Sequence, residues 1–167
     1  FNLDAIEAVS ERLPDVPQVA CFDTSFHRGQ PAVAEIVPLP RELCRGGVQR
    51  YGFHGLSYEY IASVLPAVAP ELARGRVIVA HLGSGASVTA VHQGRSVDTT
   101  MGLTPAGGIL MGTRTGDLDP GVLLFELRRG LSVEELERAV FHASGLEGLS
   151  GGTHDMRALL SRRATDP

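Results

Sequence analysis

The sequence predicts an α/β fold in which hairpin connections prevent the sheet from being purely parallel. Three apolar runs of strand type follow one another at Val77–Leu82, Ala86–His92 and Ser96–Thr99. Tight turns at Gly83–Gly85 and Gln93–Gly94 join them, as in antiparallel hairpins. Segments with helical spacing and capping residues precede and follow this block, so the chain mixes strands with helices.

Helices are expected on both sides of the strands. Apolar residues recur at helical spacing over 3–13, and Pro14 ends that segment. Ser57 is placed to cap a helix that stops within 66–70. Asp119–Pro120 is a helix start, with Asp as the N-cap and Pro at the first helical position.

Four further segments complete the prediction. Val19–Phe22 is expected to be a short buried strand that ends at a polar cluster. Ser132–Glu135 is a capping box that opens a helix. Gly145–Gly152 is expected to be a flexible loop, and Thr153 to cap a last helix.

The composition is that of a globular chain in a reducing compartment. Of the 167 residues, 43% are hydrophobic and 20% charged, with a net charge of −4. No apolar run approaches the ~18–20 residues of a membrane span, and the acidic balance argues against nucleic acid as a partner. Cys21 and Cys44 are too few for a disulfide scaffold or a zinc site, which favours the cytoplasm.

All 15 basic side chains are Arg, because the sequence contains no Lys. This absence excludes a Walker-type phosphate loop and any Schiff-base mechanism, since both need an amine. Residue 1 is Phe and 164–167 form no evident closing element. We therefore expect the chain to be a piece of a longer protein.

Two polar clusters precede the strands. Asp23 follows the first predicted strand, where a carboxylate can hold a hydrated Mg²⁺ or orient an attacking group. The alternative is a turn residue that caps Thr24 or Ser25. His54 lies between two glycines and can donate a hydrogen bond to a phosphoryl group. The alternative for this histidine is a surface or structural role.

Two more clusters lie within and after the strands. The turn made of His81, Leu82, Gly83, Ser84 and Gly85 offers backbone N–H groups as an anion nest, to which the hydroxyls of Ser84 and Ser87 add donors; an ordinary hairpin turn is the alternative. Arg114 stands between glycines before a predicted helix, where a guanidinium can clamp phosphate or carboxylate oxygens. Its alternative role is to pair with Asp117 or Asp119.

Taken together and in this order, the clusters resemble those of the acetate kinase (acetate/propionate kinase) family. The resemblance covers essentially the whole chain at near-constant offsets. Its motifs are Phe22-Asp23-Thr24-x-Phe26-His27, Arg50-Tyr51-Gly52-Phe53-His54-Gly55, His81-Leu82-Gly83-x-Gly85, Asp98-Thr99-x-Met101-Gly102, Met111-Gly112-Thr113-Arg114-x-Gly116-Asp117-x-Asp119-Pro120, Ser144-Gly145-Leu146 and Asp155-Met156-Arg157.

The resemblance implies an actin-like ATPase fold of the ribonuclease H-like type, with a mixed sheet and flanking helices. It assigns residues 1–24 to the end of a first kinase domain and 25–167 to part of a second domain that binds nucleotide and dimerises. The implied reaction is reversible transfer of the ATP γ-phosphate to acetate, or to another short carboxylate such as propionate, in a cytoplasmic homodimer. Mg²⁺ accompanies ATP, and the family's magnesium ligands lie outside this chain.

The resemblance also implies residue roles. Asp23 matches a catalytic proton donor or acceptor, and His54 and Arg114 match residues that stabilise the transition state. His81 to Gly85 match a nucleotide phosphate loop, and Asp155, Met156 and Arg157 match a second nucleotide-contacting segment. Because a carboxylate substrate is already ionised at neutral pH, no base is needed, and we prefer Asp23 as an organiser of Mg²⁺ or its waters.

Two departures from the family pattern bear on nucleotide and acyl preference, and a third concerns Tyr58. Ser84 stands where many members have Asn, and Ala106-Gly107 replaces a Leu-Glu pair. Tyr58 stands where His is common, and it is given no catalytic role. The alternative to a kinase is a non-catalytic fragment that binds nucleotide or a partner chain, and the isolated chain is expected to be inactive.

Overall fold

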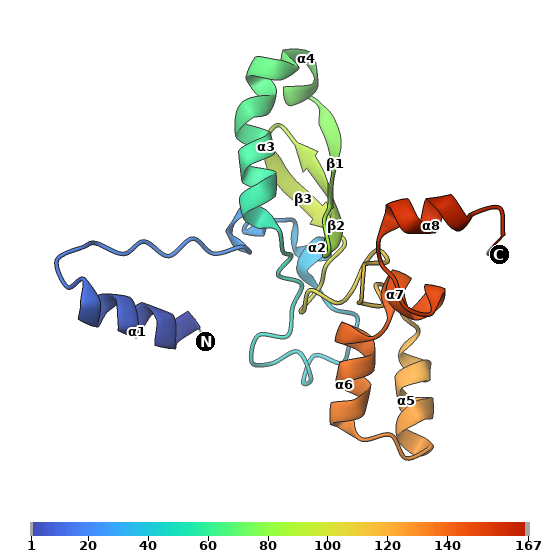
Figure 1. Ribbon diagram of the computed structural model, residues 1–167. Coiled ribbons are helices and arrows are strands. Elements are labelled where there is room, and N and C mark those ends of the chain that lie inside the picture. Colours follow the sequence, from blue (N-terminus) through green and yellow to red (C-terminus); the bar gives the residue numbers. More distant parts are fainter. Residues whose placement is uncertain (1, 166–167) are drawn as a thin grey trace.

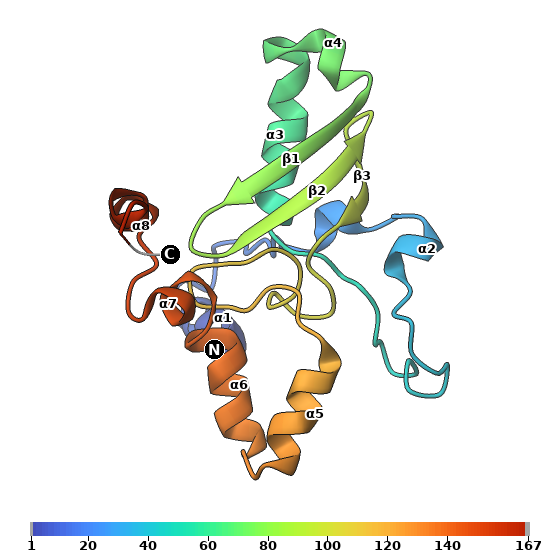
Figure 2. The same cartoon turned by 90° about the vertical axis from the view of Figure 1, so that its right-hand side faces the viewer.

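The computed structural model describes residues 2–165 and shows a three-stranded sheet covered by one long helix, with short helices at one end (Figures 1 and 2). No helix within this range is both long and apolar enough to cross a membrane. The elements are, in chain order, α1 (Asn2–Arg12), the 3₁₀ helix η1 (Ser25–His27), α2 (Ala32–Glu35), α3 (Gly55–Val68), α4 (Pro70–Ala73), β1 (Arg76–Leu82), β2 (Ala86–His92), β3 (Arg95–Thr99), α5 (Pro120–Arg128), α6 (Val133–His142), α7 (Gly145–Ser150) and α8 (Met156–Arg162).

The sheet is antiparallel throughout, in the order β1-β2-β3. The β1–β2 hairpin pairs His81 with Ser87 across its closing turn. The β2–β3 hairpin turns at Gln93 and Gly94, which both have positive φ as such a turn requires. These hairpins confirm the three predicted strands and the prediction that the sheet is not purely parallel.

Helix α3 packs along one face of the sheet (Figure 2). A narrow seam between them is lined by Tyr58, Ile61 and Leu65 from the helix and by Val79 and Val91 from the strands. The helix begins at Gly55, two residues before the predicted cap, Ser57, because the distant carboxylate of Asp23 accepts hydrogen bonds from its first N–H groups.

The apolar core is small and lies under the closing turn of the β1–β2 hairpin. Ala86, Met101 and Met111 are buried, and Phe53 and Ile109 pack at their edge. These residues come from the loop before α3, from β2 and from the long segment between β3 and α5. The core therefore joins the three segments that carry the candidate catalytic residues and the candidate phosphate loop.

The N-terminal arm, formed by α1 and the chain that follows it, extends away from the sheet (Figure 1). The predicted strand Val19–Phe22 is wrong: this segment is extended, but no strand of the described residues pairs with it. Val19 is 84% exposed and Phe22 68%. An apolar run becomes a strand only where a neighbouring strand takes up its backbone hydrogen bonds.

The predicted loop at Gly145–Gly152 is also wrong, because α7 occupies most of it. The backbone N–H groups of Leu146 and Glu147 donate to the carbonyls of Met111 and Gly112, each at 2.9 Å. These bonds tie the first turn of α7 to a segment 35 residues earlier, which a local pattern cannot reveal.

The last helix is capped two residues later than predicted. Asp155, and not Thr153, is the N-cap residue of α8, and its side chain accepts a hydrogen bond from the N–H of Arg157 at 2.9 Å. The hydroxyl of Thr153 accepts from the N–H of Asp155 instead. The capping box at Ser132–Glu135 and the Asp119 cap of α5 are confirmed.

Candidate active site

Asp23 fixes the first turn of α3 in place. Its Oδ2 accepts a hydrogen bond from the N–H of His54 at 2.6 Å, and its Oδ1 accepts a longer one from Leu56 at 3.5 Å. Its own carbonyl accepts from the N–H of Gly55 at 2.7 Å. Asp23 therefore caps a helix 31 residues further along instead of Thr24 or Ser25, and a carboxylate is stabilised at such a helix N-terminus.

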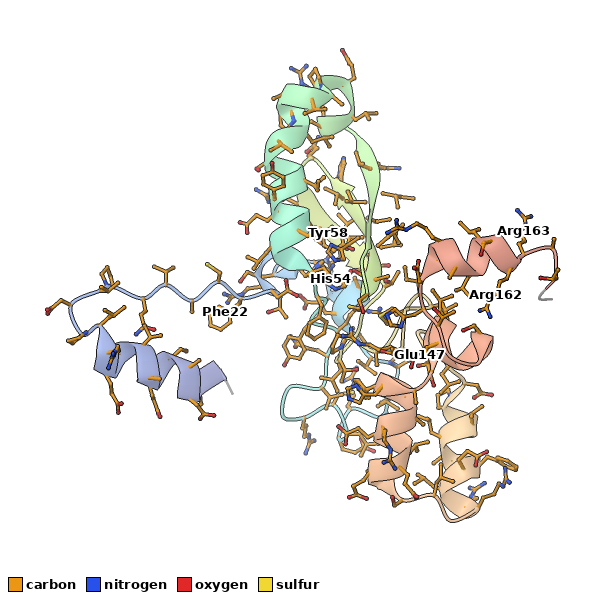
Figure 3. All side chains as sticks on the ribbon, in the orientation of Figure 1. Phe22, His54, Tyr58, Glu147, Arg162 and Arg163 are labelled. Atoms are coloured by element: carbon orange, nitrogen blue, oxygen red, sulfur yellow. The ribbon has the colours of Figure 1, made fainter. Side chains whose placement is uncertain are left out.

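His54 is held at this helix start in a left-handed conformation, with φ at 59°. Its ring Nδ1 lies 2.8 Å from the hydroxyl oxygen of Ser87, and the ring stacks on His81 with centroids 4.1 Å apart. Figure 3 shows His54 close to Tyr58, at the lower end of α3. Burial and the neighbouring His81 lower the pKa of His54, while Asp23 opposes that effect. The lowered pKa favours the neutral form of the His54 ring.

Arg114 approaches the same place from the segment before α5. One guanidinium nitrogen, Nη1, donates a hydrogen bond to the carbonyl of Pro105 at 3.1 Å. Within residues 2–165 the guanidinium forms no ion pair with a carboxylate, so the predicted pairing with Asp117 or Asp119 is wrong. Asp119 instead caps α5. The charge of Arg114 stays uncompensated and available to an anion.

Gly85 lies between His54 and Arg114. A Cβ placed on Gly85 would lie 3.1 Å from Nη1 of Arg114 and 3.3 Å from Nε2 of His54. The absence of a side chain at Gly85 lets both donors approach its backbone closely. The structure thus brings together one guanidinium and one imidazole, from residues 60 positions apart, around a glycine.

The candidate phosphate loop is the closing turn of the β1–β2 hairpin, from His81 to Gly85. Gly83 donates its N–H to the carbonyl of Gly85 at 3.0 Å, so this N–H is used within the turn. The carbonyl of Ser84 accepts from the N–H of Gly112 at 3.1 Å, which ties the turn to the Arg114 segment. Leu82 is 74% exposed. The turn is thus a hairpin turn that also borders the two donors, and its role as an anion nest stays a prediction.

Ser87 differs from its expected role as a donor in the turn. Its side chain is fully buried and points away from solvent, with its hydroxyl near the ring of His54 and 2.5 Å from the hydroxyl of Tyr58. Tyr58, to which the sequence assigned no role, is 1% exposed. The sequence does not predict the contact between Ser87 and Tyr58, because the packing of α3 against β2 brings these two residues together.

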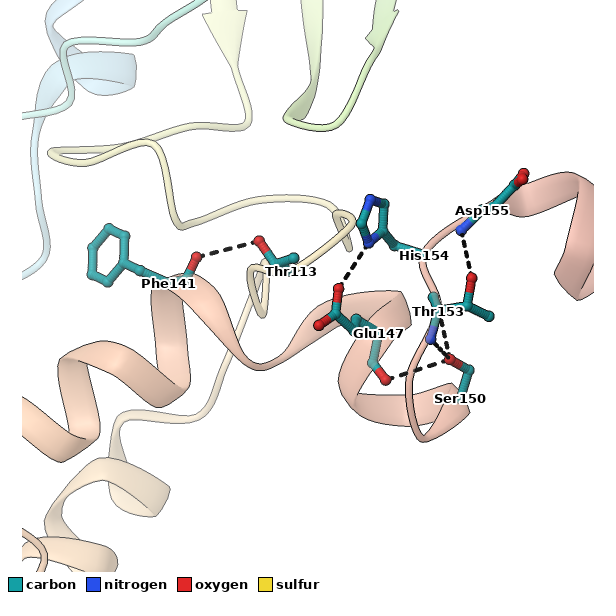
Figure 4. Close-up of polar contacts among 7 residues, drawn as sticks. All are labelled: Thr113, Phe141, Glu147, Ser150, Thr153, His154 and Asp155. Atoms are coloured by element: carbon teal, nitrogen blue, oxygen red, sulfur yellow. Dashed lines mark hydrogen bonds and ion pairs between the residues drawn. The ribbon is translucent and has the colours of Figure 1, made fainter.

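Among the described residues, the segment of Asp155, Met156 and Arg157 forms no hydrogen bond or ion pair with His54 or Arg114, but the preceding residue, His154, lies beside Gly112. The side chain of His154 lies 3.5 Å from where a Cβ on Gly112 would be, and its Nδ1 lies 2.8 Å from Oε2 of Glu147 (Figure 4). All three residues of the segment are exposed. His154, which the sequence analysis did not single out, is thus their contact with the Arg114 segment.

The described residues do not by themselves build a metal centre. Within 2–165 no three side chains of His, Cys, Asp or Glu converge in a way that could hold an ion. Asp23 supplies the one carboxylate beside His54, and both of its oxygens accept backbone hydrogen bonds. The side chains present thus suit, at most, contact with water molecules of an ion that a phosphate ligand carries.

These features define an α/β chain with a candidate site for an anionic group, formed by a guanidinium, a neutral imidazole and a glycine turn. Comparison with known proteins agrees with this class. The model of the acetokinase family matches residues 1–166. The chain belongs to the acetokinase family.

The relatives and solved structures place the chain within that family. The acetate kinase of Nitrobacter hamburgensis is 54% identical over 159 residues, which are 95% of this chain and 39% of that protein. The crystal structure of Porphyromonas gingivalis acetate kinase superposes with a TM-score of 0.89 at 37% identity, over 98% of this chain and 42% of that one. A propionate kinase from Francisella tularensis gives 0.89 at 38% identity, over 97% and 42%.

The chain therefore spans about 40% of the length of the curated relatives that it matches. It covers 39% of the Nitrobacter hamburgensis protein and 41% of an acetate kinase from Rhodopseudomonas palustris. Its solved relatives have the actin-like ATPase fold, so the hairpin sheet and the helices around it are part of that fold. The α/β prediction and the family resemblance are confirmed.

Proposed function

We propose that this chain is part of a carboxylate kinase that reversibly transfers the γ-phosphate of ATP to acetate, giving ADP and acetyl phosphate. The observation that supports this most is the convergence of Arg114 Nη1 and His54 Nε2 beside Gly85. Phosphoryl transfer requires mainly positioning and neutralisation of the charge on the transferred group. A guanidinium and an imidazole N–H are suited to that task.

In the proposed reaction, a carboxylate oxygen of acetate attacks the γ-phosphorus while the bond to the β-phosphate oxygen breaks. The carboxylate is already ionised at neutral pH, so no side chain has to remove a proton. Arg114 and His54 donate hydrogen bonds to the equatorial oxygens of the moving phosphoryl group. Asp23 holds His54 in position through the backbone N–H of that residue. A Mg²⁺ ion that ATP carries would supply further positive charge, and Asp23 would hold it through water molecules.

The nucleotide is proposed to bind at the turn from His81 to Gly85 and at Asp155–Arg157. The exposure of Gly83 and Ser84, and of all three residues at Asp155–Arg157, supports this assignment. The hydrogen bond from Gly112 to Ser84 would let nucleotide binding at the turn fix the Arg114 segment as well. The roles of Met156 and Arg157 rest on the family resemblance.

We propose further that residues 1–24 close a first domain, that 25–167 belong to a second domain, and that the protein acts as a cytoplasmic homodimer. The exposed apolar side chains on the N-terminal arm and on the outer face of β1, such as Ile78 at 77%, support a role within a larger assembly. The isolated chain is expected to be inactive and to retain, at most, binding of nucleotide or a partner.

Propionate is the second candidate substrate, because a propionate kinase superposes on the chain as well as an acetate kinase does. The two acids differ by one methylene group, which a pocket distinguishes only by a factor of about 10–200. Comparing kcat/KM for acetate and propionate in the full-length native protein decides between them.

The central experiment replaces Arg114 in the full-length native protein. Arg114→Ala should lower kcat by roughly 10³-fold or more, because such an arginine acts on the transition state, while ATP binding largely persists. Turnover is measured by trapping acetyl phosphate as the hydroxamate, and ATP binding by calorimetry. Arg129→Ala, which removes an exposed arginine paired with Glu126, is the control. Near-normal turnover of Arg114→Ala would refute the assignment.

A further inference from the structure

Two successive hydrogen bonds link the buried side chains of Tyr58 and Ser87 to the ring of His54. The hydroxyl of Tyr58 lies 2.5 Å from Oγ of Ser87, and that Oγ lies 2.8 Å from Nδ1 of His54. Tyr58 is 1% exposed and Ser87 0%, so neither hydroxyl reaches solvent. Within the described residues these are the hydrogen bonds that the two hydroxyls form.

Counting hydrogens leaves one arrangement in which every group is satisfied. Each hydroxyl has a single hydrogen to donate, and a buried hydroxyl needs a partner for it. If Tyr58 donates to Ser87 and Ser87 donates to Nδ1 of His54, both hydrogens are used. If Nδ1 of His54 carries a hydrogen and donates to Ser87, one buried hydroxyl hydrogen has no acceptor.

We infer that Tyr58 and Ser87 set the tautomer of His54, so that Nδ1 accepts a hydrogen bond and the ring hydrogen sits on Nε2. Nε2 is the nitrogen beside Gly85 and Arg114. The hydrogen therefore points to the place where, on the proposed function, the transferred phosphoryl group lies. Tyr58 and Ser87 are positioning residues, since they act through His54 and do not themselves reach that place.

The surroundings of the ring agree with a neutral histidine that donates from Nε2. The ring is stacked on His81, with the two ring planes 20° apart, and Arg114 lies across Gly85. Both neighbours disfavour an additional positive charge on His54, and burial lowers the pKa of the ring further, against the opposing effect of Asp23. The site thus separates two tasks: Arg114 supplies the charge and His54 an oriented neutral donor.

The hydrogen bonds are also expected to strengthen one another. A hydroxyl that accepts a hydrogen bond becomes a better donor, so Tyr58 reinforces the bond from Ser87 to His54. Removing Ser87 should therefore have a larger effect than removing the hydroxyl of Tyr58. In Tyr58→Phe the hydroxyl of Ser87 can still donate its hydrogen to Nδ1 of His54.

The first test measures the tautomer directly, in the full-length native protein labelled with ¹⁵N-histidine. The nitrogen chemical shifts distinguish a protonated from an unprotonated ring nitrogen, and the His54 signals are identified by their loss in His54→Gln. At pH 7 we expect Nε2 of His54 to be protonated and Nδ1 to be unprotonated. A proton on Nδ1, or on both nitrogens, would overturn the inference.

The second test uses variants and a matched control. Ser87→Ala should give a mixture of both tautomers and lower kcat on the order of 10–100-fold with little change in KM, the range seen when the partner that orients a metal-bound histidine is lost. Tyr58→Phe should act in the same direction but less. Thr89→Val removes an equally buried hydroxyl on the same face of β2, bonded to Thr99, and should change neither the tautomer nor kcat.

The two readouts separate this inference from the proposed function. An unchanged tautomer in Ser87→Ala would overturn the role of Ser87, whatever the activity. A protein with the expected tautomer that forms no acetyl phosphate would contradict the proposed kinase activity and leave the assignment of the His54 hydrogen standing.

Discussion

The sheet with helix α3 and the group of helices from α5 to α8 build their polar contacts in different ways. Around the sheet, buried polar side chains bond across long stretches of sequence: His27 meets Ser96 and His54 meets Ser87. In the helical group the side-chain bonds are mostly local, as between Ser132 and Glu135. The long-range bonds can fix a site from separate segments, whereas local bonds mainly decide where helices begin.

Burial follows the same division. The buried residues gather at the sheet and in the segment from β3 to α5, and many of them are polar, including Ser87, Thr89 and Ser96. Helices α5, α6 and α8 contain no buried residue. A substitution at the sheet should therefore affect the site or the whole fold, and one in the helical group should have a small local effect. The predictions below test this difference.

The largest effect is expected at Gly85. In Gly85→Ala the new methyl group would lie 3.1 Å from Arg114 Nη1 and 3.3 Å from His54 Nε2, in the space proposed for the phosphoryl group. The activity of the full-length native protein should fall by about 100-fold or more, since displacing reacting groups by about 1 Å has that effect. Gly85 does not have positive φ, so the backbone tolerates alanine.

Gly75→Ala is the control for that substitution. Gly75 also lacks positive φ, and a Cβ there would meet nothing closer than 3.5 Å. Both variants are compared for acetyl phosphate formation and for thermal unfolding. If Gly85→Ala kept its activity, the space between His54 and Arg114 would not be the reaction site.

An intermediate effect is expected at His27, as a dependence of stability on pH. Burial lowers the pKa of His27 below its ordinary value of 6.5, and its ring nitrogens bond to Ser96 and to the carbonyl of Phe53 at 2.9 Å each. Below pH 6.5 the unfolded chain therefore binds more protons than the folded one. The free energy of unfolding should decrease as the pH falls, by at most about 1.4 kcal/mol for each pH unit.

Urea unfolding between pH 5 and pH 8 measures this slope in the native protein and in His27→Gln. The slope should be shallower in the variant, because the ionisable group is gone. His142→Gln, on the exposed surface of α6, controls for the loss of a histidine as such. Equal slopes in the native protein and in His27→Gln would show that His27 is not the buried group that resists protonation.

What the sequence predicts reflects the same contrast. The three strands, the capping box at Ser132–Glu135 and the Asp119 cap follow from residues within a few positions of one another, and the structure contains them. The strand at Val19–Phe22 and the loop at Gly145–Gly152 are wrong because partners elsewhere in the chain decide them. Local spacing carries no information on such partners.

For the candidate site, the motifs name Asp23, His54 and Arg114 but not how they are held. The sequence did not indicate that Asp23 caps α3, or that Ser87 turns inward to His54. It likewise did not indicate that the hydroxyl of Tyr58 forms a hydrogen bond with Ser87. Each of these contacts joins two segments at least 29 residues apart, so only the fold reveals them.

The smallest effect is expected at Ser132. Its hydroxyl accepts from the N–H of Glu135 at 3.2 Å, and its own N–H donates to the carboxylate of Glu135 at 2.8 Å. Ser132→Ala should lower the free energy of unfolding by about 1 kcal/mol, as for other N-cap residues, and Ser132→Asp should retain most of it. The other end of α6 contacts the Arg114 segment, where Thr113 bonds to the carbonyl of Phe141 at 3.4 Å (Figure 4). Ser132 lies at the far end of the helix from this contact, so fraying there should leave kcat unchanged. If Ser132→Ala lowered kcat and Ser132→Asp restored it, the helical group would position Arg114. The contrast between the two regions would then fail.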